Sequence, residues 1–134
     1  MSDTIERDDV NVMFLRTPDE VKEIQRGWAR LEELVPPRGR KFYGTFDPRT
    51  KEYRVCVQVK EGDDPTSLGL ELGVIPGGTY LRERLRGEPQ AIYQQIAPTF
   101  QKLVKRAASP DESRPSIEFY RERDEIDLLL PVAD

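Results

Sequence analysis

Hydrophobic and polar positions follow two different spacings along this chain. Over residues 52–60, hydrophobic side chains occupy every second position, which is typical of a strand with one buried face. Over 21–35 they recur at steps of three and four, which predicts an amphipathic helix. Thr17 and Pro18 precede that run, and we expect them to be the N-cap and the first helical residue.

The same succession of elements is predicted twice. Strands are expected at 11–16, 41–46 and 52–60 in the first half and at 78–86, 116–121 and 125–130 in the second, where a helix spans 89–107. Pro98 is expected to kink or split this second helix. The halves, about 10–62 and 73–132, therefore predict an α+β fold made of a duplicated βαββ unit. We expect one antiparallel sheet with two long helices on one face and a ligand groove on the other.

Two segments fall outside this pattern. Residues 1–9 are polar and acidic, and we expect a disordered N-terminus followed by one domain over 10–134. Residues 62–77 are rich in glycine and proline and are expected to form a loop, while the last hairpin should turn at 122–124.

Composition excludes several classes of function. The chain has 134 residues, with 21 basic and 25 acidic side chains and a net charge of −4, which argues against direct nucleic-acid binding. It has no histidine and a single cysteine, Cys56, so one chain cannot assemble a Ser-His-Asp or Cys-His catalytic set. Zinc sites built on His and Cys and histidine-ligated haem are excluded for the same reason, and we expect no cofactor. Neither a targeting segment nor an apolar run of membrane-spanning length is visible, which favours a cytoplasmic location.

Four motifs in the second half carry a resemblance to a known family. They are Ile-Pro-Gly-Gly-Thr-Tyr at 75–80, Gly87 before the helix, Ile-Glu-Phe-Tyr at 117–120 and Ile-Asp-Leu-Leu-Leu-Pro at 126–131. In this order and spacing they resemble the GyrI-like family, a small-molecule-binding domain that is also the effector-binding domain of AraC- and MerR-type multidrug-sensing activators. The resemblance is clearest over 74–132, and only the order of elements extends it to 10–60. With no DNA-binding helices before the domain, the chain resembles the stand-alone members.

The resemblance implies a pocket lined with aromatic side chains, in which a strand glutamate attracts lipophilic cations. The matching residue is Glu118. Alternation along its strand puts Glu118 and Tyr120 on one face and Ile117 and Phe119 on the other. We expect the latter two to pack under the helices, so that Glu118 faces the groove, where a half-buried carboxylate has a raised pKa unless a cation arrives. The alternative is an exposed glutamate paired with an arginine such as Arg82.

Aromatic residues are the candidates for the walls of this pocket, because their faces hold organic cations. Trp28 lies on the apolar stripe of the first helix and could be core instead, and Tyr93 could be an ordinary residue of the second helix. The ligand-binding candidates are Glu118, Tyr120, Tyr80, Tyr93, Trp28 and Tyr43.

The favoured hypothesis is a stand-alone sensor or sequestering protein for a hydrophobic, cationic small molecule. One alternative is a hydrolase of strained electrophilic toxins of the cyclopropane type, with Glu118 as the catalytic group. Another is an inhibitor protein that acts on a macromolecular partner such as gyrase. Binding is favoured over catalysis, and no metal is expected.

Overall fold

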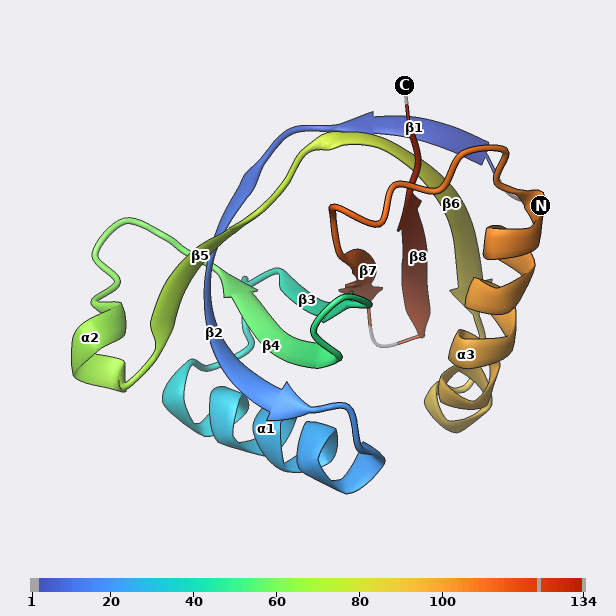
Figure 1. Cartoon of the computed structure of the whole chain (residues 1–134). Helices are drawn as coiled ribbons and strands as arrows, with labels where there is room; N and C mark the ends of the chain where they lie inside the picture. Colours follow the sequence, from blue (N-terminus) through green and yellow to red (C-terminus); the bar gives the residue numbers. More distant parts are fainter. Residues whose placement is uncertain (1–2, 123, 134) are drawn as a thin grey trace.

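The computed structural model of the chain describes residues 3–122 and 124–133. Within them, one antiparallel sheet of eight strands is accompanied by three helices. Figure 1 shows the sheet as a strongly curved arch, with α1 and α3 packed against it at different places. The mixed α+β class expected from the sequence is confirmed.

Two βαββ units make up most of the sheet. The first contains β2 (Val10–Pro18), α1 (Val21–Leu34), β3 (Phe42–Asp47) and β4 (Glu52–Gln58). The second contains β6 (Gly78–Arg86), α3 (Pro89–Arg106), β7 (Ser116–Glu122) and β8 (Glu125–Pro131). The strand order is β1-β6-β8-β7-β3-β4-β2-β5, so the two units meet where β3 pairs with β7.

The first strand was not expected. Residues 1–9 were predicted to be disordered, which is wrong for β1 (Asp3–Arg7), because this segment pairs with β6. Its acidic character has a structural use, since the Asp3 carboxylate lies 2.6 Å from the Arg82 guanidinium across the pair. Residues 1 and 2 lie outside the described part of the chain.

The segment expected to be a loop contains two elements. α2 (Pro65–Leu68) is capped by Asp64, which accepts a hydrogen bond from the Ser67 backbone N–H. β5 (Glu71–Ile75) pairs with β2 in the same register in which β1 pairs with β6. β1–β2 and β5–β6 therefore form one long two-stranded ribbon, which curves across the top of the arch in Figure 1. A local reading of glycine and proline cannot reveal this pairing, because it joins segments about 60 residues apart.

The helix boundaries differ slightly from those predicted. Thr17 and Pro18 are not a helix start but continue β2, where they pair with Tyr53 and Glu52 of β4. The N-cap of α1 is Glu20. Pro98 lies inside α3, which remains a single helix. The expected turn at 122–124 joins β7 to β8, but its central residue lies outside the described part.

The core has a layer on each side of the sheet. On the face that α1 and α3 cover, here called the helix face, one cluster centred on Leu31 packs under α1 and another centred on Leu103 packs under α3. On the opposite side, the inner face, Ile117 is buried in a third cluster, and Phe119 packs against it. The sequence expectation for β7 is therefore reversed, because Ile117 and Phe119 turn away from the helices.

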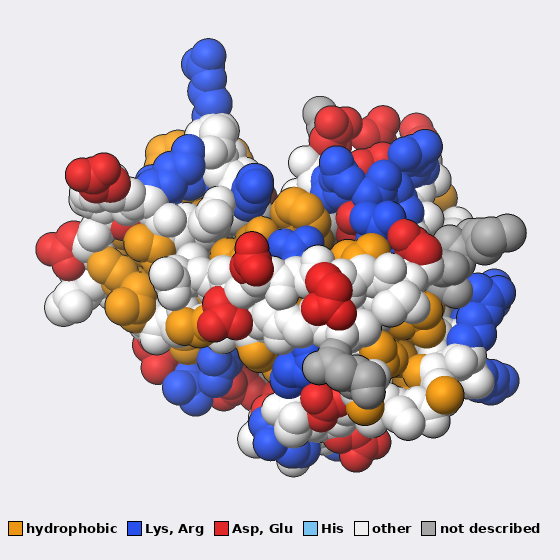
Figure 2. All heavy atoms as spheres, turned by 90° about the horizontal axis from the view of Figure 1, so that it is seen from above, with side chains coloured by type: hydrophobic (Ala, Val, Ile, Leu, Met, Phe, Trp, Pro, Cys, Tyr) orange, Lys and Arg blue, Asp and Glu red, His pale blue; other side chains and the backbone are white. Residues whose placement is uncertain are grey.

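The inner face is also where a groove lies, as the fold prediction expected. Its cavity of about 250 Å³ has an apolar floor that includes Phe14 and Cys56 and a charged rim that includes Glu52 and Arg54. On the face of the molecule in Figure 2, Lys and Arg side chains are interspersed with Asp and Glu. Among the described residues, no helix has the length and apolarity needed to cross a membrane.

Candidate functional site

Glu118 lies at the junction of the two βαββ units, on the helix face. β7 places it opposite Gly44 of β3 on one side and Leu128 of β8 on the other. The residue is half-buried, so protein surrounds much of the carboxyl group while solvent still reaches part of the side chain. The glutamate that the family resemblance singled out therefore stands between the regions covered by α1 and α3, and away from the inner groove.

The two oxygens of this carboxylate have different surroundings. Tyr53 and Tyr120 both donate their hydroxyl hydrogen bonds to Oε1, at 2.7 Å and 2.5 Å. Oε2 accepts no hydrogen bond from any described residue. Every fully buried side-chain oxygen and nitrogen in the described part of the chain has a partner, so Oε2 must be in contact with solvent. The carboxylate is thus held by one oxygen and open at the other.

No positive side chain neutralises Glu118. Among the described residues, no Lys or Arg nitrogen lies within the 4.0 Å that defines an ion pair with it. Burial raises the pKa of the Glu118 carboxyl above its usual value, the two tyrosine hydrogen bonds work against this rise, and the negative charge of Asp19 adds to it. Burial also raises the pKa of Tyr53 and Tyr120 well above 10.0, so both hydroxyls remain protonated donors at neutral pH.

Gly44 creates the space in which this arrangement forms. A Cβ atom at this position would overlap the Tyr53 hydroxyl and would lie 3.1 Å from Oε1 of Glu118. Because glycine has no side chain, the Tyr53 ring can cross β3 and reach the carboxylate on the next strand. A glycine is therefore required at position 44, because Tyr53 and Glu118 approach the backbone too closely for any side chain to fit.

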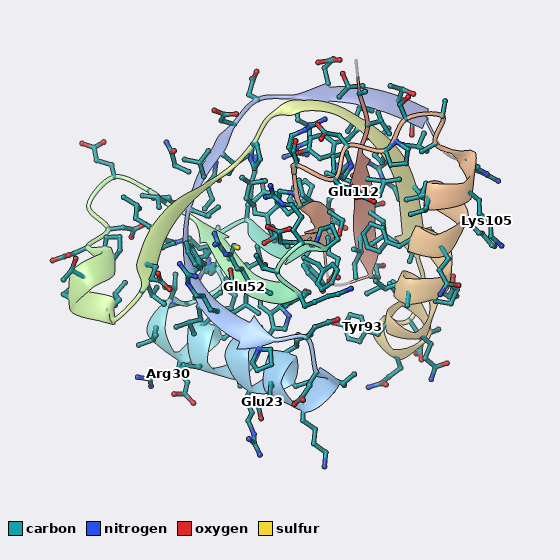
Figure 3. The ribbon with its side chains drawn as sticks, in the orientation of Figure 1. Glu23, Arg30, Glu52, Tyr93, Lys105 and Glu112 are labelled. Atoms are coloured by element: carbon teal, nitrogen blue, oxygen red, sulfur yellow. The ribbon has the colours of Figure 1, made fainter. Side chains whose placement is uncertain are left out.

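Aromatic side chains of α1 and α3 lie near Tyr120, whose hydroxyl binds the carboxylate. The Trp28 ring of α1 meets the Tyr120 ring edge to face at a centroid distance of 5.1 Å and the Phe42 ring at 6.2 Å. Trp28, Tyr120 and Phe42 are all half-buried. Tyr93 is 51% exposed and lies on the side of α3 that faces α1 (Figure 3), close enough to influence the pKa of Tyr120.

The remaining two candidate tyrosines lie on the inner face. Tyr43 is stacked on Phe119 at 4.8 Å and accepts a hydrogen bond of 3.4 Å from Arg7. Tyr80 is fully buried, and its hydroxyl donates to the Pro76 carbonyl. The structure therefore brings Glu118, Tyr120, Trp28 and Tyr93 together on the helix face, and it places Tyr43 and Tyr80 on the other side of the sheet.

Sequence reasoning missed Tyr53, Gly44 and Phe42. Tyr53 occupies an apolar-face position of the alternating strand 52–60, so its place under the helices could have been expected. Its contact with Glu118 depends on the pairing of β3 with β7, which joins the two halves of the chain. No local pattern in the sequence signals that pairing.

Comparison with known proteins finds likeness in structure only. No family model and no curated protein matches the chain. Integron cassette protein VCH_CASS2 from the mobile metagenome of Vibrio cholerae is similar with a TM-score of 0.77 and 14% identity, over 98% of this chain and 95% of that one. SAV2435 bound to tetraphenylphosphonium has a TM-score of 0.67 and 13% identity, over 99% and 94% of the two chains. The C-terminal domain of EcmrR has a TM-score of 0.66 and 12% identity, over 100% and 98%.

These likenesses extend over almost the whole of each chain and agree with the duplicated βαββ architecture. The chain has the GyrI-like fold, which it shares with the C-terminal domain of EcmrR. The resemblance seen in the sequence motifs of the second half is thus confirmed at the level of the fold.

Proposed function

We propose that this protein binds a hydrophobic organic cation at Glu118, on the helix face between α1 and α3. The observation that carries the proposal is the carboxylate itself. It is half-buried, it has no Lys or Arg partner among the described residues, and one of its oxygens is open. A carboxylate in this state is costly to keep ionised, and a cation would supply the missing partner.

The aromatic rings around Glu118 fit the same ligand. The faces and edges of Trp28 and Tyr120 would contact the apolar part of the molecule, and a desolvated cation over such a ring gains about 0.5–2 kcal/mol. The two tyrosine hydroxyls keep Glu118 in place while it is unoccupied. The similarity to SAV2435, whose structure contains tetraphenylphosphonium, supports this ligand class.

Tetraphenylphosphonium and tetraphenylborate provide a direct test, because they have nearly the same shape and opposite charges. Trp28 is the only tryptophan and touches Tyr120, so its fluorescence reports on this site alone. We expect the phosphonium to quench or shift Trp28 emission saturably and the borate to bind at least tenfold more weakly, a difference of about 1.4 kcal/mol or more.

Two variants identify the residue responsible. Glu118→Gln should weaken phosphonium binding at least tenfold. Glu112→Gln removes the same charge from an exposed residue between α3 and β7, away from Tyr93 and α1 (Figure 3), and should leave affinity unchanged. Equal binding of the two ions, or equal affinity in wild type and Glu118→Gln, would contradict the proposal. The hydrolase and inhibitor hypotheses stay predictions from the sequence.

A further inference from the structure

We infer that the site distinguishes between kinds of cation, and that it prefers a protonated amine to a quaternary ammonium ion of the same size. This inference rests on the proposed function and concerns the same carboxylate. It follows from the unequal surroundings of the two Glu118 oxygens, of which Oε1 is bound by two hydroxyls and Oε2 by none.

Oε1 has no capacity left for a ligand. A carboxylate oxygen has two lone pairs in its plane, and Tyr53 and Tyr120 each donate to this oxygen. Rotating the carboxylate to present Oε1 to a ligand would break both hydrogen bonds at once. The two hydroxyls come from β4 and β7, which both pair with β3, and from rings that pack in the clusters under α1 and α3, so they hold the carboxylate in one orientation.

Oε2 keeps its full acceptor capacity for water or for a ligand. No described residue donates to Oε2, and Oε2 is in contact with solvent. The charged group with a resolved influence on Glu118 is Asp19, which is an acid and cannot donate when ionised. An occupant that displaces water from Oε2 must therefore replace the lost hydrogen bond, because an unsatisfied buried acceptor is costly.

Protonated amines and quaternary ions differ at this point. An ammonium N–H can donate a short, charge-assisted hydrogen bond to Oε2, which brings the two charges close together. A quaternary nitrogen is shielded by its alkyl groups and has no proton to donate, so it gains only the longer-range attraction and the contact with aromatic rings. We therefore expect at least a tenfold preference for the amine, the smallest effect typical of a hydrogen bond to a charged group.

The experiment uses a matched pair of ligands that differ by one methyl group. These are N,N-dimethyl-4-phenylbenzylamine, which is protonated at pH 7, and its N-methylated quaternary salt. Calorimetric titration of the full chain gives both dissociation constants, and displacement of tetraphenylphosphonium followed by Trp28 emission confirms that both ligands occupy the same site. The expected ratio of quaternary to amine dissociation constants is ten or more.

Glu118→Gln sharpens the test, because it reverses the polarity of the open position. The tyrosine hydroxyls need an acceptor, so the glutamine carbonyl should take the place of Oε1 and its NH₂ group the place of Oε2. A donor would then face the ligand, and the amine should lose more affinity than the quaternary ion. The ratio should fall to about one or below in Glu118→Gln and stay at its wild-type value in Glu112→Gln.

The outcomes separate this inference from the proposed function. Equal affinities for the pair in wild type, or a preference that survives in Glu118→Gln, would overturn the inference while tetraphenylphosphonium binding still supports the function. Failure of both the amine and its quaternary salt to bind when tetraphenylphosphonium does bind would also overturn the inference. Failure of all three cations to bind would overturn the proposed function itself.

Discussion

Two acidic residues on neighbouring strands of the sheet have opposite surroundings. Asp127 of β8 lies on the inner face, is 3% exposed, and has the guanidinium groups of three arginines around it, at 2.6 Å for Arg84, 3.7 Å for Arg121 and 4.0 Å for Arg82. Glu118 of β7 lies on the helix face, where two neutral hydroxyls are its only hydrogen-bond donors among the described residues.

This difference separates an acid that stabilises the fold from one that is available to a ligand. Asp127 has its charge balanced within the chain, and removing that charge takes from Arg84 its shortest ion pair and leaves the guanidinium, among the described residues, only Glu125 at 3.9 Å. Glu118 has no such balance, and its burial makes ionisation unfavourable. Both residues occur in apolar strands, and the arginines across the sheet determine which of the two is neutralised.

The largest effect is expected at Asp127. Asp127→Asn removes the charge that holds Arg84 in a two-point interaction, in which the guanidinium Nε and Nη2 donate to the two carboxylate oxygens at 2.6 and 3.1 Å. We expect the free energy of unfolding in urea to fall by about 2–3 kcal/mol. The affinity of the folded variant for tetraphenylphosphonium should be unchanged, because Asp127 faces the other side of the sheet. A loss of stability below about 0.5 kcal/mol would show that Asp127 is not the structural acid of the pair.

A smaller loss of stability is expected at Gly44. Gly44→Ala places a methyl group on the Tyr53 hydroxyl and must displace that ring from Glu118, at a cost of about 1–2 kcal/mol. Cation affinity should also fall, since the carboxylate loses one of the two hydrogen bonds that fix it. In the double variant with Tyr53→Phe the overlap with the hydroxyl is gone and only the 2.8 Å contact with the ring carbon Cζ remains, so its loss of stability should be less than the sum of the two single losses. Additive losses would mean that the methyl group does not act through Tyr53.

Much of this arrangement was predictable from the sequence, and the rest depends on long-range pairing. Residues 52–60 alternate strictly and 21–35 repeat at helical spacing, so β4 and α1 follow from local patterns. β1 and β5 do not follow from local patterns. The short acidic segment β1 is a strand because it pairs with β6, and the glycine-containing segment β5 is a strand because it pairs with β2.

The candidate site shows the same division. Alternation correctly put Glu118 and Tyr120 on one face of β7, but it could not say which face the helices cover. Ile117 and Phe119 are as apolar as residues under a helix should be, yet they pack into the inner cluster, which also needs apolar side chains. When both faces of a strand are buried, hydrophobicity no longer identifies the side. Tyr43 and Tyr80 were grouped with Glu118 as aromatic candidates for the pocket wall, and both lie on the inner face.

The smallest effect on stability is expected for Glu118→Gln, and its sign is opposite to that of Asp127→Asn. Burial raises the pKa of Glu118 above 4.5, so the folded protein binds this proton more tightly than the unfolded chain. Stability is then lost as the pH rises through the folded-state pKa. Glu118→Gln avoids that loss, so it should be more stable than wild type at pH 7, and the difference should vanish as the pH falls to 4.5 and below. A variant less stable than wild type at pH 7 would show that Glu118 contributes to folding as Asp127 does.

The most direct test of the central claim is the titration of Glu118 itself. Carboxyl carbon NMR of protein labelled at the glutamate side chains can follow each carboxylate with pH, and the signal missing in Glu118→Gln is that of Glu118. The titration midpoint should lie above 4.5 in the free protein and should fall when tetraphenylphosphonium saturates the site, because the cation favours the ionised form. A midpoint at or below 4.5 in the free protein, or one that saturating cation does not move, would contradict the account of Glu118 as an unpaired acid that binds a cationic ligand.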